Sequence, residues 1–329
     1  MVSKDIITRL MSERRPLLRG YIIGRLSHLI PILIGITFLS FALMHTVTTD
    51  TVDILYDQNG GATEAAAAEK RAVLGLDKDF FTQYVNWVVK ILQGDMGNSF
   101  VSGAPVLTSI LDKLPATVEL MVLALLITLV ISLPLGILAA IRKDSIWDQI
   151  VRLLSFTGNS LPDFFVAIIL LYLFAVKWHI FSFLQADSST LPVLPALTLA
   201  IAMTAKYMRQ IRAVFLDELG KDYVRAALSR GLPYRYVLTH YVLRSVAAPL
   251  LALLAVSAGS LLGGAAIIES IFLWDGIGKL AVDAIMMRDY PVIQAYVIWM
   301  SVIYVGVNLL SDIVCGFLDP RSALQGKED

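Results

Sequence analysis

The sequence contains little charge for its length. Only 16% of its 329 residues are Asp, Glu, Lys or Arg, whereas about 25% are charged in a typical soluble domain. In contrast, 57% of the residues are hydrophobic, and the mean hydropathy is +0.71. Because the apolar residues are gathered in long runs, this composition excludes an ordinary soluble globular protein and indicates a membrane protein.

Cysteine is scarce, and motifs of enzyme chemistry are missing. The single cysteine, Cys315, excludes a disulfide within the chain and is interpreted as a small buried apolar side chain. No two of the four histidines have the spacing of metal ligands on one helix face, so no metal site is predicted. Residues 276–280 (GIGKL) lack the first glycine and the final hydroxyl of a phosphate-binding loop. We therefore expect this chain to be no enzyme and to bind no cofactor and no nucleic acid.

Six apolar segments approach the length of about 20 residues that a helix needs to cross a bilayer core of about 30 Å. They are roughly residues 21–47, 116–141, 150–176, 191–208, 246–268 and 292–317. The first is too long for the apolar part of a cleaved signal peptide, so we interpret it as a retained anchor. The third is the weakest, because Asp163 lies inside it and a carboxylate there costs about 2.5–3.5 kcal/mol.

The positions of lysine and arginine predict the orientation of these spans. Basic residues favour cytosolic loops, and here they concentrate in both tails, around residues 142–152 and in the segment 207–245. The sequence thus predicts an all-α polytopic membrane protein with six transmembrane helices and both termini in the cytosol. Its parts are a cytosolic tail or interfacial helix (1–20), a first transmembrane helix (21–47), an external helical insert (48–115), a five-helix core (116–317) with a cytosolic loop (207–245), and a cytosolic tail (318–329).

The external insert is expected to be helical. The segment FFTQYVNWVVKIL places Phe80, Tyr84, Val88 and Ile91 on one face of a helix, and this face needs a partner surface. The preceding segment ATEAAAAEKRAVLG favours another helix that ends at Gly75.

A basic segment, RAALSRGLPYRYVLTHYVLRSVAAP, starts at Arg225 between two of the apolar runs. Residues 222–229 favour a short helix that Gly231 ends, and Pro233 favours the start of a second helix. A short helix that stands clear of the bilayer suits insertion into a groove on a cytosolic partner. Alternatively, the arginines only set the topology and contact lipid headgroups.

The fifth apolar segment contains small residues at four-residue spacing. Such residues let another helix approach closely, either in a static packing seam or along the wall of a pathway. They are Ala255, Gly259 and Gly263, with Ser260 and Gly264 beside them.

Several motifs resemble those of a known family. Arg225-Ala226-Ala227, followed by Gly231, resembles the EAA loop in the membrane subunits of binding-protein-dependent ABC importers, with Arg225 in place of the family's glutamate. Four further segments resemble the dipeptide, oligopeptide and nickel permeases of that family. They are LGLDKDFFTQYVNWVVKILQGDMGNSF, LPATVEL, IIESIFLWDGIGKLAVDAIMMRDYPVIQ and NLLSDIVCGFLDPR. One departure is Asp79, where the family usually has proline.

The resemblance implies a type I ABC importer permease fold in the inner membrane of a bacterium. It implies four kinds of partner: a second homologous permease, two ATP-binding cassette subunits that hold ATP and Mg²⁺, an external solute-binding protein, and membrane lipid. The cargo would be short peptides or nickel and other metal chelates.

The resemblance also implies roles for particular residues. Contact with the ATPase is expected at Arg225, Ala226, Ala227, Gly231 and Pro233. The translocation path is expected along Ala255, Gly259, Ser260, Gly263 and Gly264. Docking of the binding protein is expected at Trp87, Asp95, Asp275 and Arg288.

Two other classes of protein compete with this interpretation. An ion-coupled secondary transporter predicts inverted repeats and discontinuous, charge-bearing spans, whereas Glu119 and Asp163 are the main ionisable residues inside the predicted spans. We interpret these two as hydrogen-bonding groups between helices or towards a partner chain. A membrane scaffold or sensor predicts a recognition domain of its own, for which the sequence has no motif.

Overall fold

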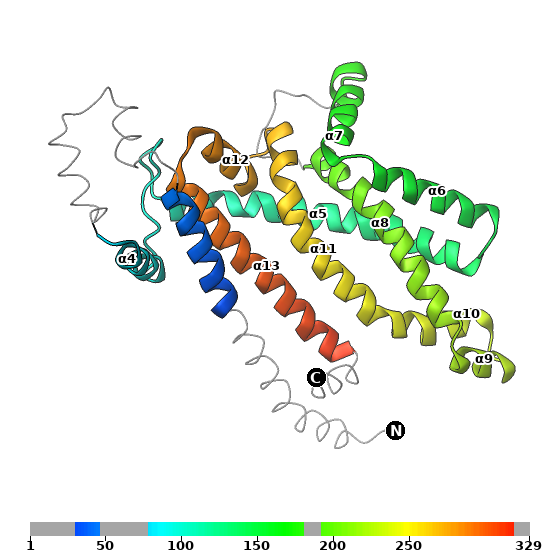
Figure 1. Ribbon diagram of the computed structural model, residues 1–329. Coiled ribbons are helices and arrows are strands. Elements are labelled where there is room, and N and C mark those ends of the chain that lie inside the picture. Colours follow the sequence, from blue (N-terminus) through cyan, green and yellow to red (C-terminus); the bar gives the residue numbers. More distant parts are fainter. Residues whose placement is uncertain (1–29, 47–77, 181–191, 319–329) are drawn as a thin grey trace, which may run out of the picture. The chain divides into compact units, whose positions relative to one another are not determined.

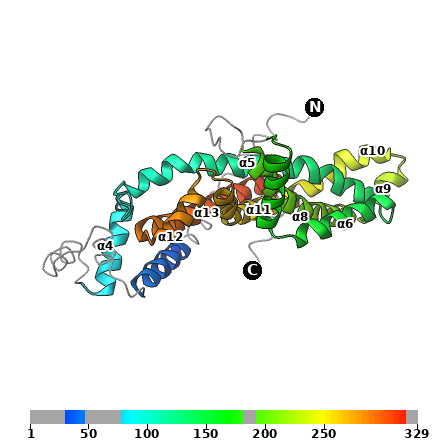
Figure 2. The same ribbon diagram turned by 90° about the horizontal axis from the view of Figure 1, so that it is seen from above.

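The computed structural model describes residues 30–46, 78–180 and 192–318, and this part of the chain is helical apart from its loops and one isolated bridge between Asn98 and Pro105. The predicted tail 1–20, the predicted tail 318–329 except its first residue, and the predicted helix that ends at Gly75 lie outside the described residues. The helices, shown in Figures 1 and 2, are Ile30–Thr46, α4 (Phe80–Leu92), α5 (Val106–Ile141), α6 (Ile146–Ser160), α7 (Asp163–Leu171), η1 (Tyr172–Lys177), α8 (Val193–Leu219), α9 (Asp222–Ser229), α10 (Tyr234–Val237), η2 (Leu238–Val242), α11 (Leu243–Ile271), α12 (Ile277–Met287) and α13 (Tyr290–Leu318).

The described residues divide into two compact units. One unit contains residues 115–180, 192–279 and 304–318, and the other contains residues 30–46, 78–114 and 280–303. The helices α5, α12 and α13 each continue from one unit into the other.

In the first unit, the core forms around α8. This helix packs against α6, α7 and α11 (Figure 1). It buries Tyr207, Ile211 and Phe215. The Tyr207 hydroxyl donates a hydrogen bond of 2.8 Å to the backbone carbonyl of Leu253 in α11, so its polar atom is satisfied inside the core.

Two glycines set the distance between α8 and its neighbours. A Cβ atom at Gly136 of α5 would lie 2.8 Å from side-chain atoms of Ile211, and one at Gly158 of α6 would lie 2.8 Å from the Cβ of Ala205. Any larger residue at either position forces the helices apart, because packed interiors have no room for an added methyl group.

The predicted third span is not one continuous helix. The helices α6 and α7 are bent by 97° at Leu161 and Pro162, so the expectation of a single helix over residues 150–176 is wrong. Proline has no N–H to continue the helix and pushes the preceding residue into an extended conformation, and Leu161 has a ψ of 131°. As a result, Asp163 lies at the start of α7, directly after the break, and not inside a helix.

Within the described ranges, three helical segments are long and apolar enough to cross a membrane: Val106–Ile141, Tyr234–Gly259 and Tyr290–Ser311. A fourth is counted if the bent pair α6–α7 forms one span, and the helix Ile30–Thr46 is shorter. The helix α8 has 27 residues, but Lys206, Arg209 and Arg212 lie in its second half. The structure therefore supports a polytopic helical membrane protein, with fewer clear spans than the six expected.

In the second unit, α4 has the amphipathic character that the sequence predicted, and its partner surface is the helix Ile30–Thr46. The rings of Phe41 and Phe80 lie 5.3 Å apart, those of Phe41 and Trp87 5.4 Å, and those of Phe38 and Tyr84 5.5 Å. Offset and edge-on ring pairs at such distances add stability beyond the area that they bury.

Asp79 supplies the N-cap of α4. Its carboxylate accepts hydrogen bonds from the backbone N–H of Thr82 at 3.1 Å and from the Thr82 hydroxyl at 2.6 Å. Both bonds lower the pKa of Asp79 below its ordinary value, and the bond from the Thr82 hydroxyl has the largest effect. The replacement of the family's proline is thereby explained, since aspartate is a preferred N-cap residue.

Candidate functional site

The basic segment folds as the sequence predicted. The helix α9 spans Asp222–Ser229, and Gly231 follows with a φ of +81°. The Gly231 N–H donates to the carbonyl of Leu228 at 2.9 Å, and the Leu232 N–H donates to that of Ala227 at 3.4 Å. This pair of bonds ends the helix in a Schellman motif, in which glycine tolerates the left-handed conformation best.

The residues expected to contact an ATPase divide into an outer and an inner group. Arg225, Ala226, Gly231 and Pro233 are exposed, whereas Ala227 is buried. Arg225 lies 3.8 Å from Asp222, but both side chains are exposed, so this ion pair adds little stability. The outer surface of α9 is therefore available to a partner.

The base of α9 is tied to the end of α8 by Glu218, which is buried. Its carboxylate accepts a hydrogen bond from the Lys221 ammonium at 2.7 Å and one from the Tyr223 hydroxyl at 2.6 Å. Because these two partners lie just before and within α9, the short helix is held in a fixed position relative to α8.

The same contacts shift the pKa values of Glu218 and Tyr223. Burial raises the pKa of Glu218, but hydrogen bonds from Lys221, Ser245 and Tyr223 outweigh that effect, and the net pKa is lowered. Burial, together with the neighbouring Glu218, raises the pKa of Tyr223 to about 12. At neutral pH the carboxylate is thus charged and the phenol is neutral, which is the arrangement that the hydrogen bonds need.

Exposed aromatic and basic side chains surround α9. Tyr223, Tyr234, Tyr236 and Tyr241 are exposed, as are Arg225, Arg230, Arg235 and Arg244. Tyrosine and arginine are enriched at protein–protein interfaces and dominate their binding energy. This composition favours a protein partner over a role in setting topology alone.

Gly259 is one of the residues predicted along the translocation path, and the structure describes its surroundings. A Cβ atom there would overlap with the ring of Tyr304 in α13, so Gly259 forms a tight packing seam. Ala255, Ser260, Gly263 and Gly264 belong to α11, and the surroundings of their side chains lie outside the described part. The assignment of these residues to a translocation path stays a prediction.

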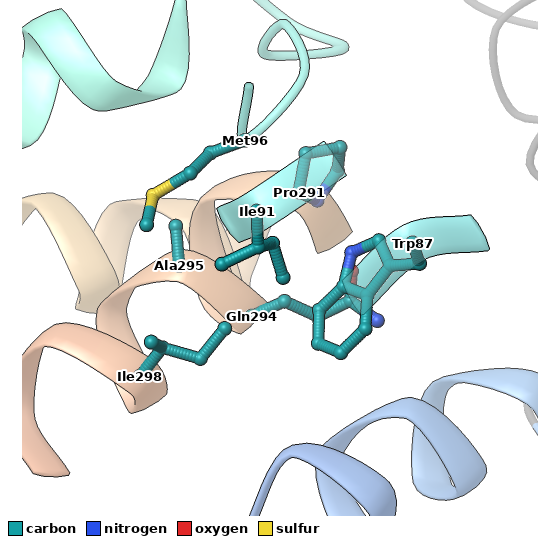
Figure 3. A pocket seen from close by; sticks show the side chains of 7 residues that line it. All are labelled: Trp87, Ile91, Met96, Pro291, Gln294, Ala295 and Ile298. Atoms are coloured by element: carbon teal, nitrogen blue, oxygen red, sulfur yellow. The ribbon is translucent and has the colours of Figure 1, made fainter. Parts of the chain in front are cut away.

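The residues expected to dock a binding protein belong to different elements. Trp87 of α4 lines a shallow hollow against the start of α13, together with Ile91, Met96, Pro291, Gln294, Ala295 and Ile298 (Figure 3). Asp95 is exposed, and its carboxylate accepts the Gly97 N–H at 2.9 Å. Asp275 is exposed in the turn between α11 and α12. Docking by these residues also stays a prediction.

Arg288 ends α12 in an unusual conformation. Its φ is +57°, a region that costs a residue with a side chain about 1–2 kcal/mol. The N–H groups of Arg288 and Asp289 bond to the carbonyls of Ile285 at 3.3 Å and Ala284 at 2.8 Å. Arg288 therefore holds the position that glycine holds after α9.

Asp289, next to it, is buried and anchors the loop that follows α4. Its carboxylate accepts hydrogen bonds from the Ser99 hydroxyl and from the backbone N–H of Phe100 at 3.0 Å. The motif that ends in Gly97-Asn-Ser-Phe100 is thus held against the start of α13 within the second unit.

A second buried carboxylate, that of Glu269, organises the end of α11. It accepts hydrogen bonds from the Thr117 hydroxyl at 2.7 Å and from the Lys279 N–H at 2.9 Å, while the Thr117 oxygen accepts the Ile277 N–H at 2.9 Å. A Cβ at Gly276 would overlap with this carboxylate. The carboxylate thus occupies the anion site at the start of α12, where N–H groups point outwards.

Sequence reasoning gave no role to Glu269, Thr117 or Asp289. The segment GIGKL partly matches a phosphate-binding loop, and the anion that it holds is the chain's own Glu269 carboxylate. The partner Thr117 lies 152 residues away, and no local pattern identifies such a pair. Among the described residues, no group of three or more His, Cys, Asp or Glu side chains is placed to hold a metal ion.

Comparison with known families gives two matches that cover most of the chain. Residues 132–323 match the family described as "Binding-protein-dependent transport system inner membrane component", and residues 17–121 match the N-terminal part of such membrane components.

Individual relatives agree with the family match. The chain is 33% identical to the dipeptide transport system permease protein DppB of Escherichia coli (strain K12), with 92% of this chain and 98% of the relative covered. It is 35% identical to the oligopeptide permease AppB of Bacillus subtilis (strain 168), with the same coverage. It is 37% identical to the nickel import permease NikB of Staphylococcus aureus (strain MRSA252), with 92% of each chain covered.

One solved structure supports the fold. A chain of the inward-facing MetNI methionine ABC transporter superposes with a TM-score of 0.54 at 13% identity, covering 64% of this chain and 96% of that chain. At this identity the likeness concerns the fold alone.

Proposed function

Because this chain belongs to the family of binding-protein-dependent transport system inner membrane components, we propose that it is the transmembrane permease subunit of an ATP-driven importer. The observation that carries the proposal is the geometry of α9. The helix presents Arg225 and Ala226 outwards while Glu218 fixes its base. A rigid, exposed helix of eight residues suits a groove on a separate motor subunit.

The proposed complex contains partners that this chain lacks. Two ATP-binding cassette subunits would hold ATP and Mg²⁺ and contact α9, one on each of two homologous permeases. An external solute-binding protein would deliver the cargo. Closure of the ATPases would displace α9 and turn the cavity outwards, as a rigid-body change of access.

The proposed location is the inner membrane of a bacterium, with both termini in the cytosol. The asymmetry of lysine and arginine supports this orientation. Exposed apolar side chains on the outward face of α6, such as Ile146, Leu153 and Phe156, need a nonaqueous surface such as lipid.

The proposed cargo is a short peptide or a nickel or metal chelate. The support comes from the relatives, whose names state dipeptide, oligopeptide and nickel transport. An ion-coupled secondary transporter is the second candidate, since the bend between α6 and α7, with Asp163 beside it, resembles the discontinuous helices of that class. The family relationship favours the importer.

The test uses the tagged chain purified together with its cellular partners. An ATPase should co-purify, and Ala226→Trp should abolish its recovery, because the indole would lie on the contact surface while the exposed site leaves folding intact. Lys143→Trp, an equally exposed change outside α9, is the matched control and should retain the ATPase. An Ala226→Trp chain that still co-purifies with the ATPase would contradict the role of α9.

A further inference from the structure

The helix α8 leads directly into α9, but α6 does not. Only Gly220 and Lys221 separate the end of α8 from the start of α9, and Glu218 braces that junction. Any displacement of α9 is therefore passed to α8. The helix α6 is not joined to α9 along the chain, and it packs side by side with α8.

A buried ion pair joins these two helices. Asp148 of α6 is fully buried, and the Arg212 guanidinium of α8 donates from Nε to Oδ1 at 2.6 Å and from Nη2 to Oδ2 at 2.8 Å. The Asp144 N–H donates to Oδ2 at 3.0 Å, and Arg152 lies 3.7 Å from Oδ1. The carboxylate is thus paired and hydrogen-bonded, as a buried charge must be.

Other described residues of this contact are apolar or small. Val151 packs with Met208 and with Ala139 of α5, and Gly158 faces Ala205. Apolar contact is non-directional, and small side chains form a smooth surface. Such an interface holds α6 against α8 but does not fix its position along the helix axis. The two parallel hydrogen bonds from Arg212 to Asp148 do fix the position of α6 along α8, because two guanidinium nitrogens must align with two carboxylate oxygens.

Because α7 follows α6 directly after the bend at Pro162, the position of α6 along α8 also affects α7. Beyond the bend, α7 packs against both α8 and α11, and α11 contains the residues expected along the translocation path. The position of α6 along α8 therefore decides where α7 meets α11.

We propose that Asp148 and Arg212 are positioning residues that lock α6 to α8, so that α6 and α7 move with α9 as one body. This inference rests on the proposed function, because it assumes that an ATPase displaces α9. It assigns the pair a role in passing the motion on, in addition to holding the fold.

The test measures a distance within the chain in the purified complex. Spin labels are placed at Ile168→Cys on α7 and Ala213→Cys on α8, both exposed, after Cys315→Ser. Distances are recorded without nucleotide and after trapping with ATP and vanadate. In the otherwise unchanged chain, the distance should stay the same in both states. Arg212→Lys keeps the positive charge but loses the paired hydrogen bonds of the guanidinium. In this variant, trapping should change the distance between the spin labels by about 2–5 Å.

Arg209→Lys is the matched control, because it makes the same change at an exposed position one turn away. It should behave like the unchanged chain. Asp148→Asn provides a second variant and should reproduce the shift. Equal distances in both states of both pair variants would overturn the proposal, and so would failure of both to assemble, which indicates a structural role alone. If no ATPase accompanies the unchanged chain, the proposed function itself fails.

Discussion

At the scale of single residues, buried carboxylates fix the position of the loops. Glu218, Glu269 and Asp289 are each buried and each accept hydrogen bonds from a turn or a helix start. A buried carboxylate that loses such partners costs several kcal/mol, so each of these contacts has one strongly preferred geometry. These three connections are therefore determined by particular acidic residues.

Arg288 gives a prediction at this scale. Arg288→Gly should raise the free energy of unfolding by about 1 kcal/mol, because glycine adopts a positive φ without strain. Thermal unfolding of the purified chain in detergent measures the change. Arg288→Ala is the control, since it removes the same side chain but keeps the strain, and it should bring no gain. If Arg288 docks the binding protein, both variants should weaken its affinity equally.

At the scale of elements, two helices show what packing adds to sequence pattern. The amphipathic face of α4 was evident from residue spacing, but its partner became evident only from the rings of Phe38 and Phe41. The third apolar run was expected to form one helix, but Pro162 breaks it, and the bend of 97° depends on how α7 packs against α8 and α11. The apolar composition of a segment indicates that it is long enough to cross a membrane. It does not predict the direction in which one helix continues from another.

The junction of α8 and α9 should respond to pH in a defined direction. The pKa of Glu218 is lowered below its ordinary value of 4.5, so its contribution is fully present above that value. The contribution is lost as the pH falls through the lowered pKa. For Tyr223 the pKa is raised from 10.0 to about 12, so its contribution is complete below pH 10 and is lost as the pH rises through that window.

Protection of the α9 amides against hydrogen exchange, corrected for intrinsic rates, measures this dependence. We expect a plateau around neutral pH with a decline on the acid side. Glu218→Gln should flatten the acid decline, and Asp217→Asn, at an exposed neighbour, should leave it unchanged. A decline that persists in Glu218→Gln would assign the effect to another group.

At the scale of the whole molecule, the question is how often the chain crosses the membrane. In the part of the chain that the structure describes, length and composition identify three helical segments that could cross, or four with the bent pair, whereas apolar runs and charge asymmetry in the sequence predict six. The difference arises partly from α8, whose second half is basic, and from the short helix Ile30–Thr46. A helix within a complex can cross with fewer apolar residues, because its polar positions face protein.

Labelling of single cysteines in intact cells tests the six-span topology, in a chain with Cys315→Ser. A cysteine at Lys78 should react with an impermeant maleimide added outside, because the insert is expected to be external. Cysteines at Lys143 and Arg230 should react only after the membrane is opened, because basic loops favour the cytosol. Reaction of Arg230→Cys from outside would invert the topology and place α9 beyond the reach of an ATPase.

The sequence by itself determined the class of protein, the family, the bounds of α9 and the amphipathic nature of α4. These features depend on composition, periodicity and capping, which act over a few neighbouring residues. Only the tertiary structure decided that Asp148 pairs with Arg212, 64 residues away, and Glu269 with Thr117, 152 residues away. The choice of partner for a buried charge depends on which helices come together, and packing alone settles that.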